Sequence, residues 1–118
     1  MRVSHFFLFS FFVNFALTVY LFFQQGISSG VAIPHFDKVG HFIAFFVLAA
    51  CLDLGSKLKV ILAVVFLASY GIVVEFIQDS IPGREASFAD VIADVAGVLF
   101  YYFIFKKTAL IQKIKSYA

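Results

Sequence analysis

Residues 6–23 read FFLFSFFVNFALTVYLFF, a run of 18 residues without a charged side chain. A helix of about 20 apolar residues is long enough to cross the hydrocarbon core of a bilayer, so the run predicts a membrane-spanning helix. A cleaved signal peptide is the alternative, because Arg2 precedes the run and small residues follow it at 28–32. We favour an uncleaved anchor, since the run exceeds a signal's apolar region and no clean cleavage motif follows.

The composition of the whole chain agrees with a lipid environment. Of its 118 residues, 63% are hydrophobic and only 14% are charged, and 18 are Phe. These values lie outside the range of soluble globular domains, and the formal charge of +2 is too small to indicate a nucleic-acid partner. Cys51 is the only cysteine, which excludes an internal disulfide and a cysteine-based metal site.

Three further apolar segments follow the first. We expect helices at residues 38–54, 58–78 and 87–105, separated by glycine, serine and proline-containing turns, and a basic tail at 106–118 with a short amphipathic turn at the interface. The length leaves room for one domain. The sequence therefore predicts an all-α integral membrane bundle of four short transmembrane helices in a single domain, residues 1–118.

The basic residues are distributed unevenly over the expected loops. If the N-terminus is cytoplasmic, seven of the nine Lys and Arg lie inside: Arg2, Lys57, Lys59, Lys106, Lys107, Lys113 and Lys115. Only Lys38 and Arg84 then lie outside. The positive-inside rule thus predicts cytoplasmic termini, with both polar turns on the exterior or periplasmic face.

Most ionisable residues other than the cytoplasmic Lys and Arg gather at the expected outer ends of three helices. They are Asp37, Lys38, His41, Glu75, Asp79, Asp90 and Asp94. A charge at bilayer depth costs about 2.5 to 3.5 kcal/mol on insertion scales, so such residues usually face a bundle interior and mark function. Helical spacing places Ser87, Asp90, Asp94, Gly97 and Tyr101 on one face, and Gly71, Glu75 and Gln78 on another.

Several of these residues also have simple structural interpretations. Ser87 with Asp90 fits a capping box, and Asp37 fits an N-cap. Glu75 and Asp94 cap nothing, and an ion pair with Arg84 is their best structural explanation.

Four other positions are most simply structural. Asp53 and Lys57, four residues apart, suggest a solvated ion pair. Asn14 suggests an interhelical hydrogen bond, and Gly97 suggests close approach of a neighbouring helix.

Three motifs in this layer have a familiar combination and order. They are Asp37-Lys38-x-x-His41, Glu75-x-x-Gln78, and Pro82-x-Arg84-x-x-Ser87-x-x-Asp90 followed by Asp94-x-x-Gly97. Over residues 37–101 the chain resembles the VanZ-like membrane protein family, whose founding member is associated with low-level teicoplanin resistance. Asp94 departs from the family pattern, which often has Asn there, and the additional carboxylate would alter charge or metal preference.

The polar layer supports two classes of function. In the first, an outward-facing pocket binds membrane lipid, such as a lipid-linked cell-wall precursor, and influences susceptibility to teicoplanin-type glycopeptides. The residues expected to bind the ligand are Asp37, Lys38, His41, Glu75, Gln78, Arg84, Ser87, Asp90 and Asp94. Arg84 suits a bidentate grip on phosphate or carboxylate.

In the second class, the chain is a small membrane enzyme acting on a polyprenyl phosphate or a related lipid. Glu75, His41 and Asp90 are its catalytic candidates, with His41 as acid or base. Glu75, Asp90 and Asp94 are the candidates for holding a divalent cation. An ion or proton path is a third and weaker hypothesis, because the other half of the bundle offers only Asn14 and Asp53 to continue it. A bundle of four short helices also favours a homo-oligomer or a membrane partner.

Overall fold

The computed structural model describes residues 3–22, 36–80 and 88–117. Its elements are helices α1 (Val3–Phe22), α2 (Phe36–Gly55), α3 (Val60–Asp79), α4 (Phe88–Phe103) and α5 (Ala109–Lys115), with a short 3-10 turn, η1 (Phe105–Lys107), before α5. Four segments are long and apolar enough to cross a membrane: Val3–Tyr20, Lys38–Gly55, Val60–Asp79 and Phe88–Lys107. The predicted all-α fold with four spanning helices is confirmed.

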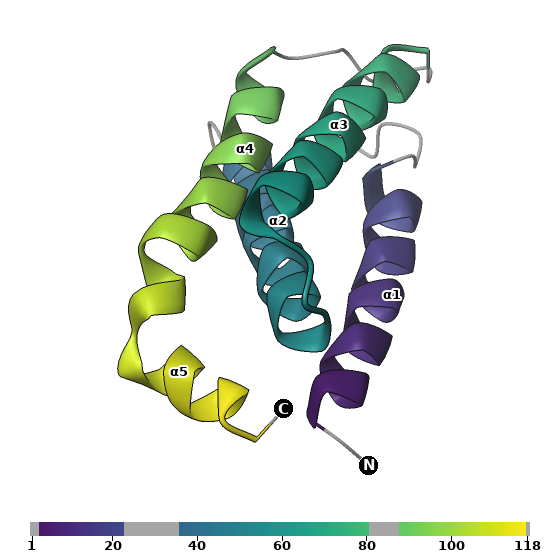
Figure 1. Cartoon of the computed structure of the whole chain (residues 1–118). Coiled ribbons are helices and arrows are strands. Elements are labelled where there is room, and N and C mark those ends of the chain that lie inside the picture. The colour runs from purple at the N-terminus through teal and green to yellow at the C-terminus, as the bar shows by residue number, and fades with distance from the viewer. Residues whose placement is uncertain (1–2, 23–35, 81–87, 118) are drawn as a thin grey trace.

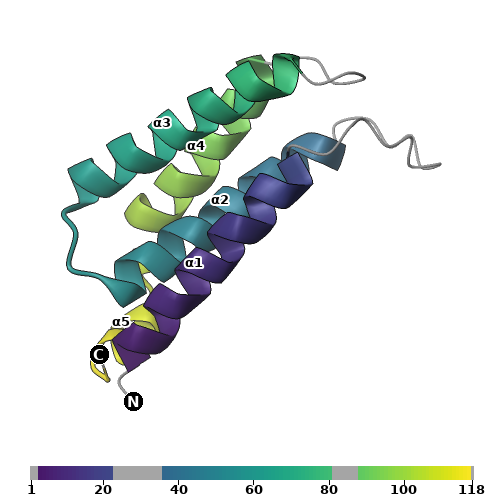
Figure 2. The ribbon, with the colours of Figure 1, turned by 90° about the vertical axis from the view of Figure 1, so that its right-hand side faces the viewer.

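Helix α2 holds the bundle together by packing against both α4 and α1. In Figure 1, α1 and α4 flank α2 on opposite sides, and Figure 2 shows α3 running beside α4. The two chain ends lie at the same end of the bundle, and α5 folds back beneath it (Figure 1). Consequently the start of α2, the end of α3 and the start of α4 meet at the opposite end.

Fully buried apolar side chains line the contacts between these helices. Phe45, Leu48 and Ala49 of α2 meet Leu67 of α3 and Val98 of α4 in a continuous core. Large apolar side chains also cover the outer surface, for example Phe9, Phe12, Phe76 and Phe103. Such a surface would be an aggregation liability in water but is the surface that lipid requires.

Small residues allow the backbones to approach one another closely. A Cβ added at Gly97 of α4 would collide with the carbonyl oxygen of Phe42 on α2, which confirms the close approach predicted at this glycine. Gly55 has the same role against the backbone of Leu8 on α1, at the other end of α2.

Two polar contacts connect helices inside the bundle, and the sequence predicted only the first of them. Asn14 donates to the carbonyl oxygen of Ser10 at 2.8 Å and reaches Cys51 Sγ on α2 at 4.0 Å, a weak version of the predicted interhelical bond. Thr18 Oγ1 and the Tyr70 hydroxyl lie 2.8 Å apart and connect α1 to α3.

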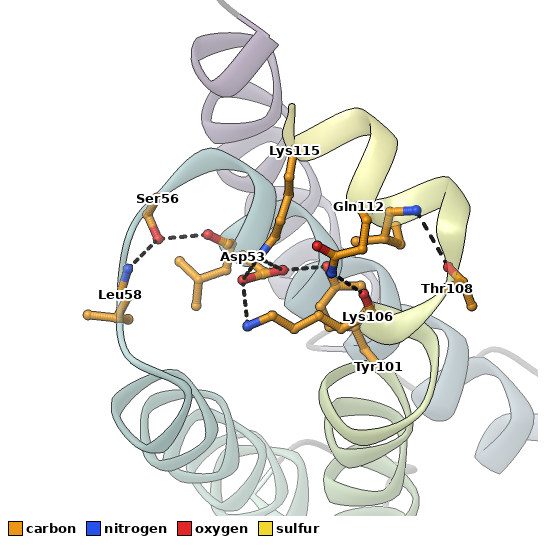
Figure 3. A network of polar contacts seen from close by, with 10 residues as sticks. Asp53, Ser56, Leu58, Tyr101, Lys106, Thr108, Gln112 and Lys115 are labelled. Carbon is orange, nitrogen blue, oxygen red and sulfur yellow. Dashed lines mark hydrogen bonds and ion pairs between the residues drawn. The ribbon is translucent and has the colours of Figure 1, made fainter. Parts of the chain in front are cut away.

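The predicted solvated ion pair between Asp53 and Lys57 is wrong. Asp53 is buried, and its described partners come from the far end of the chain: Tyr101 of α4, Lys106 of η1 and Lys115 of α5 (Figure 3). The pattern of four-residue spacing missed this because the chain folds back after α4 and brings η1 and α5 to the end of α2.

Candidate functional site

The polar layer predicted from the sequence is assembled at the end of the bundle away from the chain termini. The start of α2 contributes Lys38 and His41, the end of α3 contributes Glu75 and Gln78, and the start of α4 contributes Asp90 and Asp94. We call these six residues the acidic layer. All of them except Lys38 are buried.

The remaining predicted site residues cannot be placed in this layer. Asp37 lies in the first turn of α2, but its side chain is outside the described part of the structure. Arg84 and Ser87 lie outside the described residues, and so does the capping box expected at Ser87.

The best-defined contact in the acidic layer is a hydrogen bond between His41 and Asp94. His41 Nδ1 lies 2.7 Å from Asp94 Oδ1, and the two side chains are only 5% and 0% exposed. Because a carboxylate can only accept, this geometry makes Nδ1 the donor and fixes the orientation of the imidazole ring. The other ring nitrogen, Nε2, lies 3.7 Å from Asp90 Oδ2. His41 is therefore held between the two acids of α4.

Lys38 supplies the cation at the edge of this layer. Its Nζ lies 3.4 Å from Asp90 Oδ1, an ion pair without hydrogen-bond geometry, and its side chain is 30% exposed. The described layer thus contains three carboxylates, one lysine and one histidine. Even with His41 protonated, acidic groups outnumber basic groups, so the layer favours cations.

Three of these side chains converge closely enough to bind one metal ion. Ligand atoms of His41, Glu75 and Asp90 all lie within 4.8 Å of one another. In metal sites a histidine commonly donates its second ring N–H to a carboxylate, which sets the tautomer and the ring orientation. The bond from His41 to Asp94 has this form. The geometry therefore favours His41, Glu75 and Asp90 as ligands, whereas the sequence suggested Glu75, Asp90 and Asp94.

Asp94 has a second contact that helps to define its role. Its Oδ2 atom is buried without a hydrogen-bond partner among the described residues and lies against Gly71 of α3. A Cβ at position 71 would stand 2.9 Å from this oxygen, so only glycine leaves room for the carboxylate. Helical spacing had placed Gly71 on the same face as Glu75, but the contact with Asp94 became visible only in the structure.

Tyr101 lies on the same buried face of α4 as Asp90 and Asp94, as the helical spacing predicted. Its hydroxyl, however, donates to Asp53 Oδ2 at 2.6 Å, near the other end of the bundle. The helical face extends from one end of α4 to the other, so one face serves two separate polar clusters.

The fold and the acidic layer together define a small multi-pass membrane protein with titratable groups buried between its helices. The sequence profile of the VanZ/LLP1 family matches residues 2–112, almost the whole chain. The chain belongs to this VanZ-like family. No curated protein and no solved structure matches it.

Proposed function

We propose that this VanZ-like protein binds a phosphate-bearing envelope lipid in the bacterial cytoplasmic membrane, through a divalent cation at the acidic layer. Binding of such a lipid-linked precursor would alter susceptibility to teicoplanin-type glycopeptides. The observation that supports this proposal best is the convergence of His41, Glu75 and Asp90 within 4.8 Å.

The charge of the layer explains why a cation is part of the proposal. A phosphate group would be repelled by three carboxylates that only Lys38 and His41 oppose among the described residues. A divalent cation between the acids and the phosphate reverses that repulsion, and metal ions are commonly the largest local charges in such sites. Two carboxylates with one imidazole suit Mn²⁺ or Zn²⁺ better than Ca²⁺, which prefers oxygen ligands alone.

Lys38 would complete recognition of the same headgroup. Its partly exposed ammonium lies at the edge of the layer, where a phosphate could reach it without entering the core. Arg84, expected beside this layer from the sequence, would add a bidentate grip.

The hydrogen bond between His41 and Asp94 favours a second candidate function, a small enzyme that cleaves or transfers a polyprenyl phosphate. A carboxylate that orients a histidine is a common arrangement for general acid and base chemistry. The two functions make different use of His41 Nε2, because a nitrogen that coordinates a metal cannot accept a proton. In the enzyme, Glu75 and Asp90 would hold the cation and Nε2 would remain available.

The first experiment measures what the protein retains from its own membrane. Wild type and Glu75→Gln are extracted in a mild detergent, and bound lipids and metals are quantified by native mass spectrometry and elemental analysis. We expect wild type to retain a stoichiometric divalent metal together with a phosphorylated polyprenyl lipid, and Glu75→Gln to lose both. Asp79→Asn is the matched control, because Asp79 is an exposed acid one turn away on α3. Identical, empty preparations of all three proteins would contradict the proposal.

Two further measurements separate binding from catalysis. Deletion of the gene should change glycopeptide susceptibility, and Glu75→Gln should reproduce the deletion while Asp79→Asn should not. With purified protein and a polyprenyl phosphate, turnover that His41→Gln abolishes while lipid and metal remain bound supports the enzyme. Loss of lipid and metal together in His41→Gln supports binding through a metal ligand.

A further inference from the structure

A second cluster of charged residues surrounds a cavity at the other end of the bundle. The cavity has a volume of about 680 Å³, within the range of ligand-binding pockets. Its lining comes from the start of α1, the end of α2, the α2–α3 loop, η1 and α5, and the residues that carry the argument are His5, Asp53, Lys57, Lys106 and Lys115. We call it the basal cavity. It is separate from the acidic layer and shares no residue with it.

The basal cavity lies where the membrane-spanning segments end. Ser4 and His5 are at the start of the first span, Gly55 ends the second, and Lys106 is at the end of the fourth. A cavity at this depth faces the headgroup region of the adjoining leaflet and not its hydrocarbon core. Its occupant is therefore drawn from headgroups or from dissolved ions.

The charges around the cavity favour an anion. Three lysines line it against a single carboxylate, Asp53, so positive charges exceed negative charges by two even with His5 neutral. Lys106 and Lys115 have side chains that are 25% and 31% exposed, which leaves part of each accessible. Lys57 lies exposed in the α2–α3 loop and has no ion pair with the described residues.

Asp53 positions two of these lysines and does not cancel all their charge. Its side chain is only 5% exposed. Lys115 Nζ lies 3.0 Å from Oδ2, Lys106 Nζ lies 3.4 Å from Oδ1, and the Tyr101 hydroxyl donates at 2.6 Å. Figure 3 shows the two lysines reaching Asp53 from different sides. Lys106 Nζ is also placed 5.4 Å from the centre of the Tyr102 ring. The two ammonium groups are thus held in place before a ligand arrives, which lowers the entropic cost of binding.

We propose that the basal cavity binds the phosphate group of an anionic phospholipid headgroup. Phosphate accepts hydrogen bonds from several ammonium groups at once, and lysine binds it as a point charge. Basic pockets between helices at the membrane surface suit anionic headgroups, each lysine near the surface adding to the attraction.

The test uses the full-length protein in a neutral detergent and counts bound lipids by native mass spectrometry. Phosphatidylglycerol is titrated, with phosphatidylcholine as the zwitterionic comparison. Lys57→Gln and Lys115→Gln should each weaken phosphatidylglycerol binding about five-fold. Lys113→Gln is the matched control, because Lys113 lies exposed on the same helix as Lys115 and does not line the cavity. Lys57→Gln disturbs no described ion pair, so it tests the site even where Lys115→Gln affects folding.

The outcomes separate the sources of the phosphate. Selective weakening by Lys57→Gln and Lys115→Gln, without competition from inorganic phosphate, supports a lipid headgroup. Selective weakening together with displacement by inorganic phosphate supports the same site for a dissolved anion. Equal effects in all three variants, or none in any of them, would overturn the proposal, because the lipid would then respond to general surface charge or bind elsewhere.

Discussion

The two polar clusters of this bundle differ in the sign of their excess charge. The acidic layer buries Asp90 and Asp94 around His41 and has one lysine at its edge. The cluster around the basal cavity buries one carboxylate, Asp53, and surrounds it with lysines that remain partly exposed. Each lysine can extend its charge toward the interface, whereas the short aspartate side chains cannot leave the interior. We infer that the acidic layer is specialised for a cation and the basal cavity for an anion.

Loss of His41 is expected to have the largest effect. In His41→Leu the Asp94 carboxylate, which is fully buried, loses its described hydrogen-bond partner. Breaking a buried charge pair by removing one partner costs about 3 to 5 kcal/mol. We therefore expect a marked fall in the midpoint of thermal unfolding in detergent. Lys115→Gln, at the basal cavity, should cost less than about 1 kcal/mol because that lysine is partly exposed and Asp53 keeps other partners.

A double variant tests the physical reason for this difference. Replacing a buried charge pair by apolar residues is often nearly neutral, so His41→Leu with Asp94→Leu should recover part of the stability lost in His41→Leu alone. Equal losses in His41→Leu and Lys115→Gln would contradict the contrast between the two clusters.

The sequence predicted the acidic layer far better than the basal cavity. The acids and His41 stand out because charges interrupt long apolar runs, and helical spacing alone places Asp90 and Asp94 on one face. The partners of Asp53 lie 48 to 62 residues away in the chain. No local pattern reports such contacts, because they depend on the turn after α4 that returns η1 and α5 to the end of α2. Local spacing instead suggested Lys57, which was wrong.

A third prediction concerns the contact between α2 and α4, the two helices that carry residues of both clusters. Gly97→Ala introduces a Cβ against the carbonyl oxygen of Phe42 and should lower the free energy of unfolding by about 1 to 3 kcal/mol. Gly40→Ala is the matched control, because no described atom lies within 4 Å of a Cβ added there. We expect it to be neutral or to stabilise α2 by up to about 1 kcal/mol. Thermal unfolding in one detergent compares them, and similar losses in both would show that the close approach at Gly97 is unimportant.

A smaller effect than that of Gly97→Ala is expected to distinguish two neighbouring tyrosines. Tyr101 and Tyr102 are both buried near the basal cavity, but only the Tyr101 hydroxyl donates to Asp53. Tyr101→Phe should cost about 1 kcal/mol, since Asp53 retains two ammonium partners after the hydroxyl is removed.

The Tyr102 hydroxyl is buried without a hydrogen-bond partner among the described residues, so Tyr102→Phe removes an uncompensated polar group. It should leave the unfolding temperature unchanged or raise it. The phosphatidylglycerol titration adds a second measurement, the affinity for the lipid. If the Tyr101 hydroxyl helps Asp53 to position Lys106 and Lys115, Tyr101→Phe should weaken phosphatidylglycerol binding. If it does not, the affinity should be unchanged. Unchanged stability in Tyr101→Phe would mean that Asp53 is held by its lysines alone, and that the order of the basal cavity depends on charge rather than on the buried hydrogen bond.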